Sequence, residues 1–335
     1  MRGLQIVDGY TSALTLRETQ KAIKLVKDTF ANELAAALNL ERVSAPFIVR
    51  KGSGINDDLN GVERKVEFDT KEIEGTAEIV QSLAKWKRTV LKAYGYGVDE
   101  GLYTNMNAIR RDDDCDNVHS IFVDQWDWER VISKEERNIE FLKDIVKKIV
   151  GAIDNTQKIA HKAFPQLKNE LATDVFFVTT QELEDMYPDK TPKEREDIIA
   201  KEKGVVFVMQ IGDLLKSGIK HDGRAPDYDD WKLNGDLLFW NETLRHAFEV
   251  SSMGIRVDSE SLAYQLKAAN AEDRMKYDYH KGIADGTLPL TIGGGIGQSR
   301  LSMLILEKAH IGEVQVSLWP DKMVEDCKNN GINLL

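Results

Sequence analysis

Two carboxylates on neighbouring predicted strands give the first indication of chemistry in this sequence. Asp236 begins the apolar segment DLLFWN, and Glu249 lies in the segment HAFEVSS that follows it. Paired carboxylates can hold a hard cation, and Mg²⁺ needs only one or two of them when phosphates supply further oxygens. Scattered carboxylates are more often solvated surface groups, so this pair is a candidate site that needs support from other features.

A glycine-rich run, GGGIG at residues 293–297, precedes Arg300. The run matches neither the G-x-G-x-x-G dinucleotide pattern nor a phosphate loop ending in Gly-Lys-Ser/Thr. A tight turn before a helix is therefore the simpler interpretation. Glycines also let another group approach the backbone closely, and an arginine at the start of a helix can stack on adenine or contact phosphate.

A predicted hairpin carries Arg110 near its turn and an alternating pattern on its returning strand. Side chains in a strand point to opposite faces in turn, so the polar and aromatic residues separate. This predicts a polar pocket on one face, although a solvent-facing edge strand would show the same pattern. The polar face comprises Gln125, Asp127 and Glu129, and the other face Trp126 and Trp128.

The segment QSLAKWKR opens a predicted helix with three basic residues. Such clusters usually form nothing more than a basic surface. Lys87, however, lies close to the candidate capping residue Ser82, so it can point with the helix N-terminus toward an anion.

The pattern of apolar and turn residues predicts the elements that must position these groups. Helices are expected over residues 15–40, 83–94 and 134–162. Strands are expected around Pro46, at residues 66–69 and 77–80, and in the long pair GLYTNMNAIR and VHSIFVDQWDWE joined by RDDDCDN. Further strands are predicted in DVFFVTT and GVVFVMQIG, with two charged helices between them and a loop over residues 214–231.

These strands come in pairs rather than alternating one to one with helices. The pattern favours an α+β fold with a mainly antiparallel central sheet flanked by helices. No linker or shift in composition divides the chain, so residues 1–335 are expected to form a single domain.

Composition narrows the class of protein. Acidic residues outnumber basic ones by 56 to 45, and the net charge of −11 has the wrong sign for a typical nucleic-acid-binding protein. Two dispersed cysteines, Cys115 and Cys327, argue against a zinc or disulfide scaffold. No signal-like segment and no stretch of 18 apolar residues occurs, so a cytoplasmic protein without membrane contact is expected.

The order of these features resembles the three motifs of a class II aminoacyl-tRNA synthetase catalytic core, and in detail its aspartyl branch. Over residues 15–319 the chain is similar to the ammonia-dependent asparagine synthetases, or aspartate–ammonia ligases. Because the core starts almost at residue 1, no anticodon-binding domain is expected. The phrases that carry the similarity are GINDDLNG, QSLAKWKR, EGLYTNMNAIR, VDQWDWERV, RAPDYDDW, LNGD, SSMGIRVD and TIGGGIGQSRL.

The resemblance implies an AMP-forming ligase that uses ATP and Mg²⁺. The side-chain carboxylate of aspartate attacks the α-phosphate of ATP to give β-aspartyl-adenylate and pyrophosphate, and ammonia then displaces AMP to give asparagine. A homodimer formed through the first helix and strand is also implied, with no nucleic-acid partner. The alternatives are a tRNA-charging enzyme and a non-catalytic relative. The second is disfavoured because Arg110 and Arg300 are both present.

Site roles follow from the resemblance one residue at a time. The ATP contacts are Arg110 on the α-phosphate, Arg300 on the adenine side or terminal phosphates, Asp229 in the nucleotide loop, and Glu249, which binds Mg²⁺ together with Asp236. The aspartate contacts are Ser82, Lys87, Gln125, Asp127, Ser252 and Arg256, with Gly293 and Gly295 leaving room for the amino acid and nucleotide. Lys87 and Arg256 can hold a carboxylate, and Asp127 can take the α-ammonium. Gln125 is counted among the catalytic residues with Arg110 and Asp57.

Asp57 matches the loop aspartate of the family and is expected to receive the ammonium ion or a proton from it. The sequence departs from the family pattern at Asp58, where a neutral amide is expected. A second departure is the run Ser251-Ser252-Met253-Gly254, which replaces a glycine-rich stretch found in the tRNA enzymes. The first leaves open which of the two aspartates acts, and the second changes the wall of the pocket.

Overall fold

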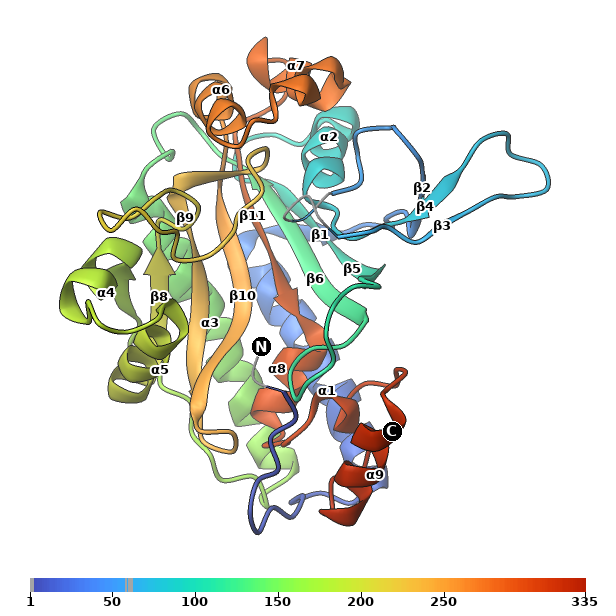
Figure 1. Ribbon diagram of the computed structural model, residues 1–335, viewed down its shortest axis with the longest axis vertical. Helices are drawn as coiled ribbons and strands as arrows, with labels where there is room; N and C mark the ends of the chain where they lie inside the picture. The colour runs from blue at the N-terminus through green and yellow to red at the C-terminus, as the bar shows by residue number, and fades with distance from the viewer. Residues whose placement is uncertain (1–2, 58, 60–62) are drawn as a thin grey trace.

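One long mixed sheet forms the centre of this computed structural model, which describes residues 3–57, 59 and 63–335 (Figure 1). Its inner pairs are antiparallel, and the two outermost described pairs are parallel. In spatial order the strands are β1 (Leu40–Arg42), β5 (Gly101–Ile109), β6 (Phe122–Val131), β11 (Thr291–Gly297), β10 (His246–Arg256), β9 (Asp229–Asn241), β8 (Val205–Met209) and β7 (Phe176–Thr179). The predicted α+β class is therefore confirmed.

Two long helices, α1 (Leu16–Leu38) and α3 (Ile139–Ala163), pack together behind the sheet. A capping box between Thr15 and Glu18 starts α1, and Asn39 in a left-handed conformation ends it. Phe30 of α1 lies against Trp126 of β6, with ring centroids 4.6 Å apart. The tryptophan face of β6 is thus buried in the core. From Val26 onward the apolar stripe of α1 packs into the core, whereas Leu16 at its start is 54% exposed.

The other face of the sheet is covered only in part. Helix α2 (Ala84–Tyr94) packs on β5, β6 and β11, and lies close to α6 (Ser259–Ala268) and α7 (Asp278–Ala284) at the top of Figure 1. The remaining described helices are α4 (Thr180–Met186), α5 (Pro192–Lys203), α8 (Gln298–Ile305), α9 (Asp321–Asn329), η1 (Glu272–Lys276) and η2 (Ile311–Glu313). The polar side chains of β6 therefore face a hollow instead of a packed layer.

Pro46 separates two short strands that belong to different sheets. The chain leaves the main sheet after β1 and enters a small sheet of β2 (Ile48–Arg50), β4 (Ala77–Ile79) and β3 (Glu67–Phe68). This small sheet carries a long turn that projects to the right of the molecule in Figure 1. The predicted strand interruption at Pro46 is confirmed.

Two sequence predictions about local structure are wrong. The GGGIG run forms no tight turn, because all five residues lie in strand β11 and helix α8 follows directly. The predicted loop over residues 214–231 ends earlier than expected, since strand β9 begins at Asp229. Within the described residues, no helix is both long and apolar enough to cross a membrane.

Candidate active site

A pocket of about 490 Å³ opens on the polar face of the sheet. Its walls come from β6, β10 and β11, the start of α2, and the loops before β6 and β9. Most of the predicted site residues line it: Ser82, Lys87, Arg110, Gln125, Asp127, Asp229, Glu249, Ser252, Arg256, Gly295 and Arg300. Asp57, Asp236 and Gly293 lie outside this lining. The interpretation of β6 as a pocket wall is therefore confirmed over that of an edge strand.

Lys87 and Asp127 form a buried ion pair at the base of the pocket. Ser82 Oγ accepts a hydrogen bond from the Ala84 amide at 3.2 Å, but the N-cap of α2 is Leu83 and not the predicted Ser82. Lys87 Nζ also donates to the Trp128 carbonyl at 2.9 Å. Burial lowers the pKa of Lys87, and Asp127 opposes this shift by favouring the charged form.

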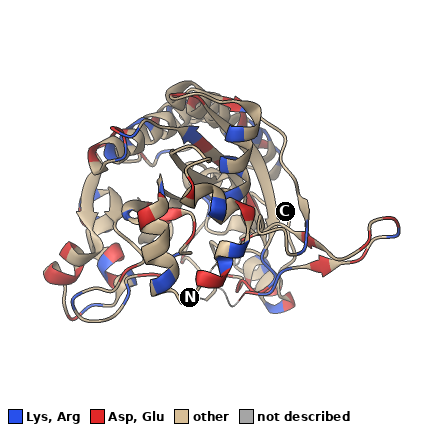
Figure 2. Ribbon diagram, turned by 90° about the horizontal axis from the view of Figure 1, so that it is seen from above, with Lys and Arg blue, Asp and Glu red and all other residues tan. Residues whose placement is uncertain are grey.

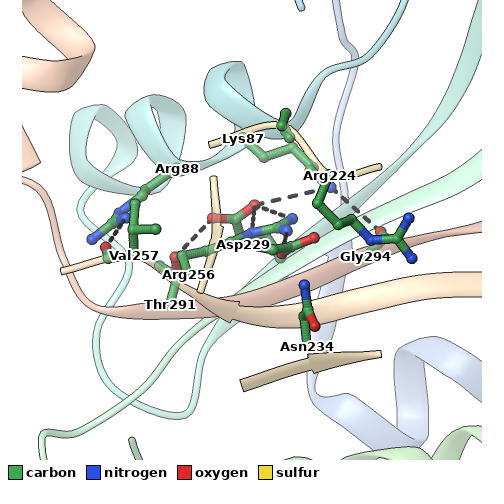
Figure 3. A network of polar contacts seen from close by, with 12 residues as sticks. Lys87, Arg88, Arg224, Asp229, Asn234, Arg256, Val257, Thr291 and Gly294 are labelled. Atoms are coloured by element: carbon green, nitrogen blue, oxygen red, sulfur yellow. Dashed lines mark hydrogen bonds and ion pairs between the residues drawn. The ribbon is translucent and has the colours of Figure 1, made fainter. Parts of the chain in front are cut away.

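Arg256 is held by two carboxylates from neighbouring strands. Its Nη2 lies 3.1 Å from Glu129 Oε2, and its Nη1 pairs with Asp229 (Figure 3). Burial opposes the charge of Arg256, but Glu129 and then Asp229 outweigh it and raise the pKa of the guanidinium. Thr291 Oγ1 donates to the second Glu129 oxygen at 2.8 Å. Asp229 thus sits on strand β9 beside Arg256, not in the loop where it was predicted.

Arg110 and Arg300 face the pocket from two other sides. Arg300 Nη1 lies 3.5 Å from Glu249 Oε1, and its Nε donates to the Val118 carbonyl at 3.4 Å. Arg110 makes a long hydrogen bond of 3.4 Å to the Gln81 carbonyl. Among the described residues no carboxylate lies within ion-pair distance of Arg110, although burial raises the pKa of Asp113 and the charge of Arg110 opposes that rise. An arginine without such an ion pair in a polar pocket suits an anionic ligand.

Asp236 and Glu249 project from one face of the β9–β10 ribbon. Asp236 pairs with Ser252 in the register and Glu249 with Leu238. The pKa of Asp236 is raised to about 6, mainly by burial. Its ion partner Arg224 lowers this pKa, and the charge of Glu249 raises it further. Burial also opposes the charge of Glu249, but Arg300 and nearby cations lower its pKa. The described residues bring no group of three or more His, Cys, Asp or Glu together as a complete metal site.

The glycines of β11 make room for protein side chains. A Cβ on Gly293 would lie 2.6 Å from Arg256 Nη2, and one on Gly295 would lie 2.4 Å from Gln125 Oε1. The predicted role, which was to leave room for substrate and nucleotide, stays a prediction. These glycines let Arg256 and Gln125 approach the strand closely, and both side chains line the pocket together with Gly295.

Asp57 is buried beneath the pocket and does not line it. Its Oδ1 lies 3.9 Å from Lys85 Nζ. Tyr228 lines the pocket. Burial, and next the nearby charge of Asp57, raise the pKa of its phenol. Asp57 is therefore near the pocket wall but behind it. Asp58, the alternative acceptor, lies outside the described residues.

Sequence reasoning missed several charged residues of the pocket lining, and two of them, Arg224 and Asp124, hold predicted site residues or their elements in place. Arg224 pairs with Asp236, and the arginine that opens the segment RAPDYDDW was a usable signal because its neighbours are acidic. Asp124 accepts hydrogen bonds from Ser299 N at 3.0 Å and Ser299 Oγ at 2.8 Å, and it also pairs with Lys27 at 2.7 Å. Asp124 thereby fixes the start of α8, next to Arg300, which no local pattern could reveal.

The sheet order and the pocket define a class II synthetase-like catalytic fold. The asparaginyl-tRNA synthetase of Entamoeba histolytica, solved with asparaginyl-adenylate, has a TM-score of 0.66 at 16% identity over 90% of this chain and 66% of its own. The aspartyl-tRNA synthetase of the same organism has a TM-score of 0.60 at 15% identity, over 89% of this chain and 58% of its own. At such identities the likeness concerns the fold alone.

Sequence comparison identifies the family within this class. Residues 17–331 match the aspartate–ammonia ligase family. The aspartate–ammonia ligase of Clostridium tetani is 61% identical over 97% of this chain and 96% of its own length, and that of Ruminiclostridium cellulolyticum is 59% identical over the full length of both. The chain belongs to the aspartate–ammonia ligases, which use ATP to make asparagine from aspartate and ammonia.

The packing of Gly293 gives a direct test of the pocket wall. Gly293→Ala places a methyl group 2.6 Å from Arg256 Nη2 and 2.7 Å from the Trp128 carbonyl. We expect a loss of about 1–3 kcal/mol in the free energy of unfolding and a higher KM for aspartate, because the strand or Arg256 must shift. Urea unfolding and steady-state kinetics measure the two effects.

Gly151→Ala is the matched control. This glycine lies in α3 with nothing within 4 Å of an added Cβ. The substitution should stabilise the helix by about 0.5–1 kcal/mol and leave the KM for aspartate unchanged. Equal behaviour of the two variants would contradict the proposed packing of Arg256.

Proposed function

We propose that asparagine forms in two steps within this one pocket. In the first, a side-chain carboxylate oxygen of aspartate attacks the α-phosphorus of ATP, and the bond to the bridging oxygen of pyrophosphate breaks. In the second, ammonia attacks the acyl carbon of β-aspartyl-adenylate, the bond to AMP breaks, and the nitrogen loses a proton. The observation that supports this route is that paired charges suited to an amino acid and arginines suited to phosphates line one cavity of about 490 Å³.

The aspartate end of the pocket is proposed to lie at Lys87, Asp127 and Arg256. Lys87 and Arg256 supply cations for the α-carboxylate, and Asp127 supplies a carboxylate for the α-ammonium. Polar contacts to the rest of the substrate are assigned to Ser82, Gln125 and Ser252, all of which line the pocket. Because opposite charges sit side by side, the arrangement suits a zwitterion better than a simple anion.

The phosphate end is proposed to lie at Arg110 and Arg300. Arg110 forms no ion pair with a carboxylate among the described residues, so it suits the α-phosphate, where negative charge builds as the adenylate forms. Arg300, at the start of α8, suits the adenine side or the terminal phosphates. Asp229 lines the same pocket, and its contact with the nucleotide stays a prediction.

Mg²⁺ is proposed to bind between Asp236 and Glu249. The two carboxylates share one face of the ribbon, and two are enough for Mg²⁺ when ATP phosphates and waters complete its shell. Both carboxylates are paired with arginines, Asp236 with Arg224 and Glu249 with Arg300. Those arginines can turn to the phosphates when the ion arrives. The bound ion would neutralise charge on the phosphates.

A homodimer is also proposed, on a different basis from the stripe of α1. Most of that stripe is buried within the chain, whereas Phe47 and Ile48 beside Pro46 are exposed by 42% and 48%. Exposed apolar residues on the small β2–β4–β3 sheet suit contact with a second copy.

The dimer proposal predicts a solution mass near twice the chain mass of 37.9 kDa. Light scattering at micromolar concentration measures it. Phe47→Asp combined with Ile48→Asp should shift the protein toward the single-chain mass. Val98→Asp, at another exposed apolar residue, should not. A wild-type protein that stays monomeric would rule the dimer out.

The two-step route is tested by its products. Incubation with aspartate, ATP, Mg²⁺ and ammonium should release AMP and pyrophosphate in equal amounts with asparagine. Release of ADP and phosphate in their place would exclude the adenylate route.

Replacement of Glu249 tests the magnesium site. Glu249→Gln keeps the shape of the side chain but removes a charge that the ion needs, so we expect adenylate formation to fall by about 100-fold or more while the fold survives. Pyrophosphate release measures the rate. Glu242→Gln, at an exposed position of the β9–β10 turn, is the control and should remain active. Wild-type activity of Glu249→Gln at ordinary Mg²⁺ would remove Glu249 from the site.

Asp57 is proposed to act only in the second step. The carboxylate can attract ammonium and take its proton, whereas adenylate formation needs no added base because the substrate carboxylate is the nucleophile. Asp57→Asn should therefore leave pyrophosphate release without ammonia nearly unchanged and slow asparagine release by about 100-fold or more. Single-turnover assays with labelled ATP separate the two steps.

Two outcomes would change this assignment. If both steps decline together, Asp57 orders its loop and does not handle ammonium. If Asp58→Asn gives the selective defect and Asp57→Asn does not, the carboxylate that handles ammonium is that of Asp58 and not that of Asp57.

A further inference from the structure

A buried charge cluster lies behind the pocket and is used by none of the steps above. Lys85, Asp227 and His280 are each exposed by 3% or less. Lys85 Nζ lies 2.9 Å from Asp227 Oδ2 and 3.9 Å from Asp57 Oδ1. The cluster therefore reaches Asp57 through Lys85, which comes from the first turn of α2.

Asp227 keeps Lys85 in place. Besides Lys85, its Oδ2 receives His280 Nε2 at 3.0 Å and Arg274 Nη1 at 2.8 Å. Burial opposes the charge of Asp227, but Lys85 and these neighbours lower its pKa. Burial likewise opposes the charge of Lys85, but Asp227 and then Asp57 raise its pKa. The lysine is therefore a fixed cation with two carboxylates sharing its charge.

Asn56 fixes the backbone of Asp57 from the other side. Its Oδ1 accepts hydrogen bonds from the amides of Asp57 at 3.0 Å and Gln81 at 2.9 Å. Its Nδ2 donates to the Ile79 carbonyl at 3.1 Å and to Glu78 Oε2 at 3.0 Å. The backbone of Asp57 is thus tied to the segment that leads into α2, and so to the element that carries Lys85.

We propose that Lys85 is a positioning residue that holds the Asp57 carboxylate charged and in place for the ammonia step. The inference rests on the proposed role of Asp57. A buried carboxylate tends to take up a proton unless a cation lies nearby, and a protonated Asp57 could neither attract ammonium nor accept its proton. At 3.9 Å the lysine acts through its charge, because this separation is too long for a hydrogen bond.

Other titratable groups around Asp57 belong to four neighbouring segments. They are Tyr228 and Asp227 before β9, His280 on α7, Arg274 on η1, and Glu78 on β4 with its ion partner Lys65. Lys85, on α2, lies within ion-pair range of Asp57. Its removal should therefore change the charge state of Asp57 more than that of the substrate pocket.

The test compares the two half-reactions in the full-length protein. Lys85→Met keeps the length of the side chain without its charge. We expect pyrophosphate release with aspartate and ATP to stay within about threefold of wild type. The ammonia step should slow by about 100-fold. The acidic limb of its pH profile should move to higher pH, because Asp57 loses a nearby cation. Lys85→Arg, which restores the charge, should recover much of the rate.

A double-mutant cycle shows whether Lys85 acts through Asp57. If it does, Lys85→Met should add little to the defect of Asp57→Asn, since the group that it supports is already neutral. If the double variant instead shows the product of the two single rate losses, the proposal is overturned. If Asp57→Asn shows no selective defect, the proposed function of Asp57 fails. If Asp57→Asn shows it and Lys85→Met does not, only the present inference fails.

Two further variants separate charge from packing. Lys308→Met removes another buried lysine, which bonds Ser12 Oγ at 2.6 Å and Thr19 Oγ1 at 2.9 Å far from Asp57, and it should leave the ratio of the two half-reactions unchanged. If Lys85→Met does not fold, Lys85→Met with Asp227→Asn removes the charge and its counter-charge together and should show the same selective defect. A parallel fall in both half-reactions would mean that Lys85 only supports the fold.

Discussion

The central constraint on this molecule is that charges buried on one face of a sheet must be paired. Lys87 pairs with Asp127, and Arg256 with Glu129 and Asp229, before any substrate is present. Breaking one such pair would leave an uncompensated buried charge, which is costly. A zwitterionic amino acid can enter without that cost, because its carboxylate takes the cation while its ammonium takes the anion. Charge pairing therefore favours a substrate with both groups.

A bulge in strand β10 decides which side chains reach the pocket. Glu249 and Ser252 are three residues apart, so in a regular strand they would point to opposite faces. The register shifts between Glu249 and Ser251, which leaves one extra residue, Val250, on β10. Glu249 and Ser252 then both face the pocket, beside Asp236 of the neighbouring strand. The extra residue thereby brings the proposed ion site and the substrate wall together.

The sequence predicted those features that depend on local periodicity. The alternation through Trp126 and Asp127 identified the two faces of β6, and the 3.6-residue spacing located α1. Features that depend on distant partners were missed or misread. GGGIG read as a turn because glycine is common in turns, yet here it is strand backbone over which Arg256 and Gln125 lie. The bulge at Val250 and the pairing of Arg224 with Asp236 likewise depend on a neighbouring strand or loop.

The segment RAPDYDDW shows how one short stretch links the two proposed chemical steps. Asp227 holds Lys85, the next acid, Asp229, holds Arg256, and Asp230 pairs with Arg137. Consecutive residues thus serve the cluster behind Asp57 and the wall of the aspartate pocket. Because each acid has its own cation, a change at one pair need not disturb the next. The two steps can share a rigid scaffold and still depend on separate charges, so that each can be weakened by substitution without the other.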